Sequence, residues 1–168
     1  IRTPLNGVLG MAQAMAAGQR AFGENYVQEG VDKILALRAS HPGVALEWHC
    51  IGPLQTNKTR LVAEHFGWVH TIDRLKVAQR LSDQRPAHLP PLQVCVQVNV
   101  DGGANKSGVA PADAPALAQA VAALPGLCLR GLMAIPEPSP DVESQQAVCE
   151  RVKAVFDGLK GVSPQWDT

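Results

Sequence analysis

The sequence has no excess of charge of either sign: fifteen lysines and arginines balance fifteen aspartates and glutamates, and the formal net charge is zero. Nucleic-acid-binding domains usually carry a basic face and polybasic segments bind anionic membranes, so this balance argues against both partners. No apolar run approaches the roughly 20 residues that span a bilayer, because Pro125, Arg130 and Pro136 interrupt the most apolar region. The N-terminus also lacks the pattern of a signal peptide. These absences predict a cytoplasmic protein.

Several chemical signatures are missing as well. The four cysteines, Cys50, Cys95, Cys128 and Cys149, form no Cys-x-x-Cys pair. A chain of 168 residues that is 46% hydrophobic can bury a core without disulfides, so we expect buried free thiols. No cluster has metal-ligand spacing, and the Gly-x-Gly-x-x-Gly, Gly-x-x-x-x-Gly-Lys-Ser/Thr and Gly-x-Ser-x-Gly motifs are absent. The sequence therefore offers no support for a metal site, a nucleotide fingerprint or a hydrolase.

What the sequence does contain is an alternation of β-like runs and helical patterns. The expected strands are Arg20–Gly23, Leu46–Gly52, Trp68–Ile72, Leu92–Val100 and Leu127–Ile135, with the opening of a sixth at Gln165–Thr168. Three expected helices have clear bounds: Asn25–Ala39, Asn57–Phe66, and a helix that Asp73 caps and that runs to Leu81. Two more are indicated by apolar residues at helical spacing, namely Ala114, Leu117, Val121 and Leu124 in the first and Val148, Val152, Val155 and Leu159 in the second. Such βα alternation predicts parallel strands with right-handed crossovers, either in a doubly wound sheet or in a (β/α) barrel.

Polar residues at the carboxyl ends of the predicted strands are the candidates for function, because parallel α/β folds place their sites there. Asn99 and His49 stand in otherwise apolar strands, where an unpaired polar group costs roughly 1–3 kcal/mol. Each is therefore either satisfied structurally or in contact with a ligand. Lys58 and Lys106 stand in loops, and the Asn-Lys-Ser-Gly setting of Lys106 favours an anion. The lysines on predicted helices are expected at the surface: Lys33, Lys76, Lys153 and Lys160.

Five segments, in order, resemble the pyridoxal-phosphate homeostasis proteins, which belong to the alanine-racemase-N-terminal-like superfamily. The segments are AAGQRAFGENYVQEGVDKI (Ala16–Ile34), WHCIGPLQTNK (Trp48–Lys58), HTIDR (His70–Arg74), NKSG (Asn105–Gly108) and GLMAIP (Gly131–Pro136). The resemblance runs from about Ala14 to Thr168. It implies a (β/α)8 barrel of the TIM type that holds pyridoxal 5′-phosphate at its carboxyl mouth. It also implies a protein that buffers the cofactor and delivers it to apo-enzymes, without an established turnover reaction.

The same resemblance implies which residues bind the cofactor. Those placed around its ring are Asn25, His49, Asn99 and Met133, and those at the rim of the mouth are Lys58 and Lys106. In the family, a lysine in a Val-Ser-Lys-Thr-Lys-Pro-like motif ends the first strand and holds the cofactor as an internal aldimine, and loops after the seventh and eighth strands hold its phosphate. That motif and those loops are absent from this sequence. We therefore expect weak labelling by the cofactor, with Lys106 ahead of Lys58.

The first thirteen residues differ from this pattern. The run IRTPLNGVLG resembles the segment just after the phospho-accepting histidine of sensor histidine kinases, but neither that histidine nor an ATP-binding domain is in the sequence. The chain also begins with Ile1 rather than methionine. These features predict a foreign segment over residues 1–13 and, over residues 14–168, a fragment of a barrel that lacks its first and last strands.

Two other functions remain open. The first is a pyridoxal-phosphate-dependent enzyme of the racemase type, which would need a further acid/base group, while the single tyrosine, Tyr26, stands in the GENY run. The second is a dimerising signalling fragment built on the kinase-like N-terminus. A barrel without its first and last strands would leave two open edges and expose its inward side chains, either Val94, Val96 and Val98 or their alternates along the strand. We therefore expect a chain that is prone to associate.

Overall fold

The computed structural model describes residues 4–102, 107–138 and 141–168. Its helices are α1 (Pro4–Ala16), α2 (Val27–Ser40), α3 (Thr59–His65), α4 (Leu75–Gln84), α5 (Ala114–Ala122) and α6 (Val142–Gly158), with a 3-10 turn, η1 (Thr56–Lys58), before α3. Its strands are β1 (Ala21–Glu24), β2 (Glu47–Cys50), β3 (Trp68–Ile72), β4 (Leu92–Gln97) and β5 (Leu127–Met133). The five predicted strands are confirmed, with shifted ends except for β3.

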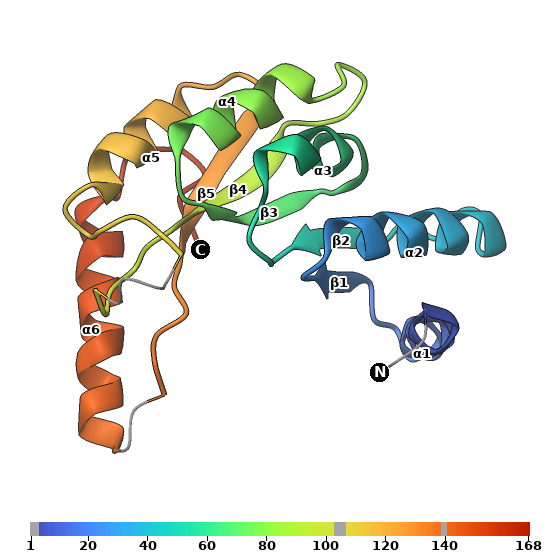
Figure 1. The fold of residues 1–168 in the computed structure, drawn as a ribbon, viewed down its shortest axis with the longest axis horizontal. Coiled ribbons are helices and arrows are strands. Elements are labelled where there is room, and N and C mark those ends of the chain that lie inside the picture. Colours follow the sequence, from blue (N-terminus) through green and yellow to red (C-terminus); the bar gives the residue numbers. More distant parts are fainter. Residues whose placement is uncertain (1–3, 103–106, 139–140) are drawn as a thin grey trace.

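The strands form one parallel sheet in which chain order is also spatial order, β1-β2-β3-β4-β5. Helices α2, α3, α4 and α5 connect consecutive strands and lie along one face of the sheet (Figure 1). Sequential order with helices on a single face is the arrangement of a (β/α) barrel, whereas a doubly wound sheet reverses its order and carries helices on both faces. Within the described ranges the sheet is open and does not close into a barrel.

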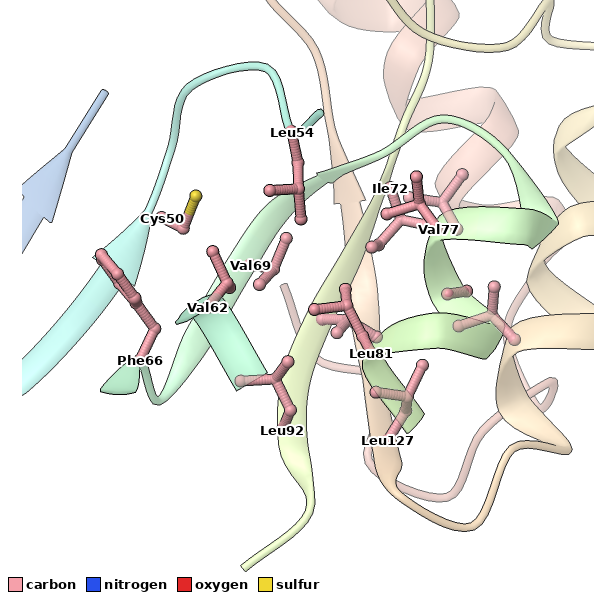
Figure 2. Packing of buried hydrophobic residues seen from close by; sticks show 14 of the residues in the cluster. Cys50, Leu54, Val62, Phe66, Val69, Ile72, Val77, Leu81, Leu92 and Leu127 are labelled. Atoms are coloured by element: carbon pink, nitrogen blue, oxygen red, sulfur yellow. The ribbon is translucent and has the colours of Figure 1, made fainter. Parts of the chain in front are cut away.

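The core lies between the sheet and these helices. Figure 2 shows Val77 and Leu81 of α4, Leu92 of β4 and Leu127 of β5 among the side chains of one buried cluster. The expectation that the β4 valines would be exposed is wrong: Val94 and Val96 are completely buried and Val98 is 2% exposed. These valines belong to the core cluster that the helices cover. Their neighbours on the opposite face, Cys95 and Gln97, are buried as well.

The four cysteines are free thiols in three different environments. Cys50 and Cys95 are buried, and burial raises the pKa of Cys50 to about 11 and that of Cys95 to about 12. Cys128 is half-buried and Cys149 is exposed on α6. The expectation of buried thiols is confirmed for the first two only.

Two predicted details at element ends are wrong. Asp73 does not cap α4, whose N-cap is Arg74 without a side-chain cap; instead, the Asp73 carboxylate accepts a hydrogen bond from Arg74. Gln165–Thr168 forms no regular strand, although the backbone N–H groups of Asp167 and Thr168 donate to the carbonyl of Arg130. The final residues therefore run beside β5 without completing a ladder.

A buried ion pair joins β1 to α2. The Lys33 ammonium lies 2.9 Å from both carboxylate oxygens of Glu24, and the two side chains are 17% and 8% exposed. Lys33 is thus not the surface lysine that was predicted, because its helix packs directly over the strand that carries Glu24.

Helix α1 spans the predicted boundary at residue 13 and places Met15 in the core. A separate N-terminal segment over residues 1–13 stays a prediction. None of the helices in the described part of the chain is long and apolar enough to cross a membrane.

Candidate functional site at the carboxyl ends of the strands

A cavity of about 700 Å³, here called the outer cavity, lies where β1, β2 and β3 end. Asn25 directly follows β1, and Asp73 directly follows β3. The segment after β2 contributes Lys58, the last residue of η1. The complete lining is Asn25, Tyr26, Val27, Gln28, Pro53, Leu54, Gln55, Lys58, Asp73, Arg74 and Ser107. This volume falls in the range of about 300–1,000 Å³ that is usual for small-molecule sites.

Hydrogen bonds to backbone carbonyls hold the three strand ends together. The N–H of Ile51 donates to the carbonyl of Glu24 at 3.0 Å, and the hydroxyl of Thr71 donates to the carbonyl of Gly52 at 2.8 Å. A side chain at Gly52 would overlap the carbonyl oxygen of Asn25, so only glycine allows this close approach. The position of Asn25 in the cavity therefore depends on Gly52.

The charged residues of the outer cavity differ in their partners. Arg74 donates to Asp73 at 2.7 Å and to the carbonyl of Leu54 at 3.0 Å, which fixes its guanidinium beside the cavity. Lys58 is half-buried, and its side-chain ammonium makes no hydrogen bond or ion pair with any residue that the structure describes. Its ammonium is therefore available to a ligand.

A smaller cavity of about 180 Å³, the inner cavity, adjoins the outer one and shares Pro53 and Ser107 with it. Its polar lining includes Thr71 and Gln97, which are 4% and 6% exposed. Sequence reasoning missed both residues. Gln97 could have been found from the sequence, because it is a polar residue inside the apolar run LQVCVQVNV. The orientation of Thr71 could not, because the register of β3 shifts between Val69 and Ile72.

His49 does not line either cavity. Its Nδ1 is hydrogen-bonded to Nε2 of His70 at 2.8 Å, and its Nε2 to the Glu47 carboxylate at 2.9 Å. Its ring stacks on Trp68, with the ring centroids 5.2 Å apart. Both ring nitrogens are thus satisfied by the protein, which supports the structural interpretation of this histidine.

Two groups in this cluster have shifted pKa values. Burial, helped by the charge of His49, lowers the pKa of His70. Burial alone would raise the pKa of Glu47, but hydrogen bonds from His49 and Trp68 and the positive charge of Arg130 hold it below its ordinary value.

The remaining predicted residues lie apart from the outer cavity. The amide oxygen of Asn99 accepts a hydrogen bond from the N–H of Gly102 at 3.1 Å, so it shapes its own loop. Met133 is half-buried at the end of β5 and pairs with Gln97, which lines the inner cavity. Lys106 lies outside the described residues. The structure therefore brings Asn25 and Lys58 together and leaves His49 and Asn99 elsewhere.

Comparison with known proteins identifies the family to which this chain is related. The family model described as "Alanine racemase, N-terminal domain" matches residues 6–166. The pyridoxal phosphate homeostasis protein of Vibrio cholerae is 58% identical over 156 residues, which are 93% of this chain and 66% of that protein. The protein of the same name from Escherichia coli K12 is 57% identical over 159 residues, 94% of this chain and 67% of that protein. The chain belongs to the pyridoxal phosphate homeostasis protein family. It spans about two thirds of the length of these curated relatives.

Solved structures agree with this membership. PipY of Synechococcus elongatus, a structure without PLP, superposes with a TM-score of 0.83 at 34% identity and covers 95% of this chain and 73% of its own. A second PipY structure is described as having PLP bound and superposes with a TM-score of 0.80 at 33% identity over 95% of this chain and 72% of its own. Alanine racemase of Clostridium difficile 630, at 15% identity and a TM-score of 0.66, shares the fold alone. The homeostasis family thus has the barrel type that the sequence predicts, here as an open five-stranded sheet.

Proposed function

We propose that this chain binds pyridoxal 5′-phosphate at the carboxyl mouth of its sheet and serves in the homeostasis of that cofactor. The observation that carries the proposal is the outer cavity, because it brings Asn25 and the unpaired Lys58 together at the strand ends. The PipY structure described with PLP bound, which covers 95% of this chain, supports the same ligand. The proposal places the protein in the cytoplasm, with cofactor-requiring apo-enzymes as recipients.

The residues of the mouth suit such a ligand. Asn25 supplies an amide that donates or accepts a hydrogen bond at a polar ring substituent, and Lys58 supplies a cation at the rim of the mouth. When bound, the cofactor supplies an aldehyde that reacts with amines, so a protein that holds it controls its supply.

We further propose that the chain performs no turnover. Racemisation needs a positioned acid and base beside the ligand. In the described lining of the outer cavity, Tyr26 is 70% exposed and Asp73 is already bound to Arg74. Neither residue is therefore held by the protein as a fixed acid or base, and binding without reaction is the function that we propose.

Titration of the purified chain with pyridoxal 5′-phosphate, followed by calorimetry and by the absorbance of the cofactor, tests the proposal. We expect saturable one-to-one binding that is weakened about fivefold by Asn25→Ala, because one neutral hydrogen bond contributes about 1 kcal/mol. Asn57→Ala, which removes an exposed amide outside the cavity lining, is the matched control and should bind like the unmodified chain. No saturable binding, or equal loss in both variants, would overturn the proposal.

A further inference from the structure

A further cavity lies at the opposite end of the sheet from the proposed cofactor site. It measures about 370 Å³ and is here called the amino-end cavity. Its lining includes Arg20 directly before β1, Glu47 at the start of β2, Gly67 directly before β3 and Pro90 shortly before β4. In a parallel sheet the amino ends of the strands share one edge and the carboxyl ends share the other. The amino-end cavity is therefore separate from the outer cavity, with which it has no lining residue in common.

We infer that the amino-end cavity binds a small organic anion with two or more carboxylate or phosphate groups, held by Arg20, Arg38 and Arg85. These three arginines line the cavity, and none of them is paired with a carboxylate of the described residues. A guanidinium presents a planar fork of donors that matches the oxygens of a carboxylate or a phosphate. Three such groups around one cavity therefore suit a ligand with several oxyanion groups.

The existing bonds of the arginines leave donors for a ligand. Arg38, in the last turn of α2, is exposed and makes no hydrogen bond or ion pair in the described ranges. Arg20 donates from Nη1 to two backbone carbonyls, and Arg85 donates from Nε and Nη1 to three. The Nη2 groups of Arg20 and Arg85 have no described partner. Burial without a counter-ion lowers the pKa of the half-buried Arg85, and a bound anion would offset the cost of holding its charge there.

The carboxylates of the lining do not cancel this positive charge. Glu47 is hydrogen-bonded to Nε2 of His49 at 2.9 Å, and Glu64 lies 3.8 Å from the guanidinium of Arg60 outside the cavity. Even with both carboxylates counted, the three guanidinium groups outnumber them in the described lining. A cleft with an excess of one charge raises the local concentration of counter-ions, so the cavity favours an anion.

The neutral part of the lining suits the carbon skeleton of an organic anion. Leu46 and Leu89 are half-buried in the wall and offer apolar contact. Nδ1 of His65 is buried in the same wall without a hydrogen-bond partner in the described structure. The volume lies within the range of about 300–1,000 Å³ that is usual for small-molecule sites, near its lower end. A compact ligand is therefore expected.

Titration with citrate and with fructose 1,6-bisphosphate at constant ionic strength, followed by NMR, tests this inference. We expect at least one probe to bind saturably and to shift amide signals at the amino ends of β1 to β4, whereas fructose, which lacks the phosphates, should not. Arg38→Gln should weaken this binding about tenfold, since charge-assisted hydrogen bonds are about twice as strong as neutral ones. Arg38→Lys, which keeps the charge without the fork, should weaken it less.

Two control variants should bind the probe like the unmodified chain. Arg151→Gln removes an exposed arginine of α6 outside the cavity, and Asn25→Ala changes the outer cavity alone. Binding of citrate alone supports a carboxylate ligand, and binding of the bisphosphate alone supports a phosphate ligand. The inference is wrong if neither probe binds saturably, if Arg38→Gln binds as tightly as the unmodified chain, or if either control loses as much affinity as Arg38→Gln. The proposed function, which concerns the other end of the sheet, does not depend on this result.

Discussion

Trp68 is the residue around which the polar side chains of β2, β3 and β5 are organised. His49 stacks on one side of the indole, and the guanidinium of Arg130 lies 4.9 Å from the ring centroid. Arg130 also donates to the amide oxygen of Gln93 at 2.9 Å and is paired with Asp167. Cation–π contacts of this kind contribute about 0.5–1 kcal/mol where they remain solvated. The imidazoles and the guanidinium thus stabilise the sheet without meeting the ligand cavities.

The pKa of His70 makes stability depend on pH. Burial, with the charge of His49, lowers this pKa below its ordinary value of about 6.5. The unfolded chain therefore binds the proton more readily than the folded chain does. The stability that His70 contributes above about pH 6.5 is lost as the pH falls through its folded-state pKa. We expect the free energy of unfolding in urea, followed by far-ultraviolet circular dichroism, to decrease from pH 7.5 to pH 5.5.

The variant His70→Asn should show a shallower decrease across that window. His88→Asn, which replaces an exposed histidine, should retain the slope of the unmodified chain. Glu47, with a pKa held below the ordinary carboxylate value, does not titrate in this range. If the free energy of unfolding of His70→Asn decreased as steeply with falling pH as that of the unmodified chain, His70 would not be the cause of the pH dependence.

At the level of elements, the approach of the β2 end to the β1 end decides the shape of the outer cavity. A side chain at Gly52 would overlap the carbonyl oxygen of Asn25, so Gly52→Ala must push the two strand ends apart. Overpacking of this kind costs about 1–3 kcal/mol, and we expect a loss of about 2 kcal/mol in the free energy of unfolding. Because Asn25 moves with β1, cofactor affinity should fall as well.

Gly158→Ala in α6 is the control, since nothing lies near the position of its added methyl group. Alanine should leave the stability of that helix unchanged or slightly higher. Equal stability of the two variants in urea unfolding would show that the strand ends tolerate separation.

The order of strands and helices could be predicted from the sequence because the strands show apolar alternation and the helices show apolar residues at helical spacing. β3 lies at the predicted residues, and Asn25 and Lys58 meet at the strand ends as the parallel arrangement implies. The orientation of Thr71 could not be predicted, because the register shift in β3 breaks the two-residue alternation. The pairing of Lys33 with Glu24 also depends on how α2 packs over β1, which spacing alone does not reveal.

For the whole molecule, the two edges of the open sheet determine how the chain can associate with other chains. β1 pairs with β2 on one side, and no strand of the described residues pairs with it on the other. Among the described residues, the opposite edge, along β5, is covered only near Arg130 and Leu132, by the backbone of Asp167 and Thr168. Unpaired backbone groups along an edge favour pairing with another chain.

We therefore expect the chain to self-associate as its concentration rises, with an average mass in sedimentation velocity that increases above that of the monomer. Ala21→Lys places a charge at the exposed start of β1 and should reduce this association several-fold, because edge lysines oppose strand pairing. Ala87→Lys adds the same charge in an exposed loop and should have no such effect. A single monomeric species at all concentrations would contradict the expectation.

Because the four thiols differ in burial, the rate at which a reagent labels each of them reports how fast the surrounding segment opens to solvent. A disulfide-forming reagent needs the thiolate, so it modifies the exposed Cys149 first. Cys50 and Cys95, with pKa values of about 11 and about 12, react only when the segment that carries each of them opens to solvent. Because Cys50 lies on β2 and Cys95 on β4, their separate labelling rates distinguish opening near the β1 edge from opening at the centre of the core.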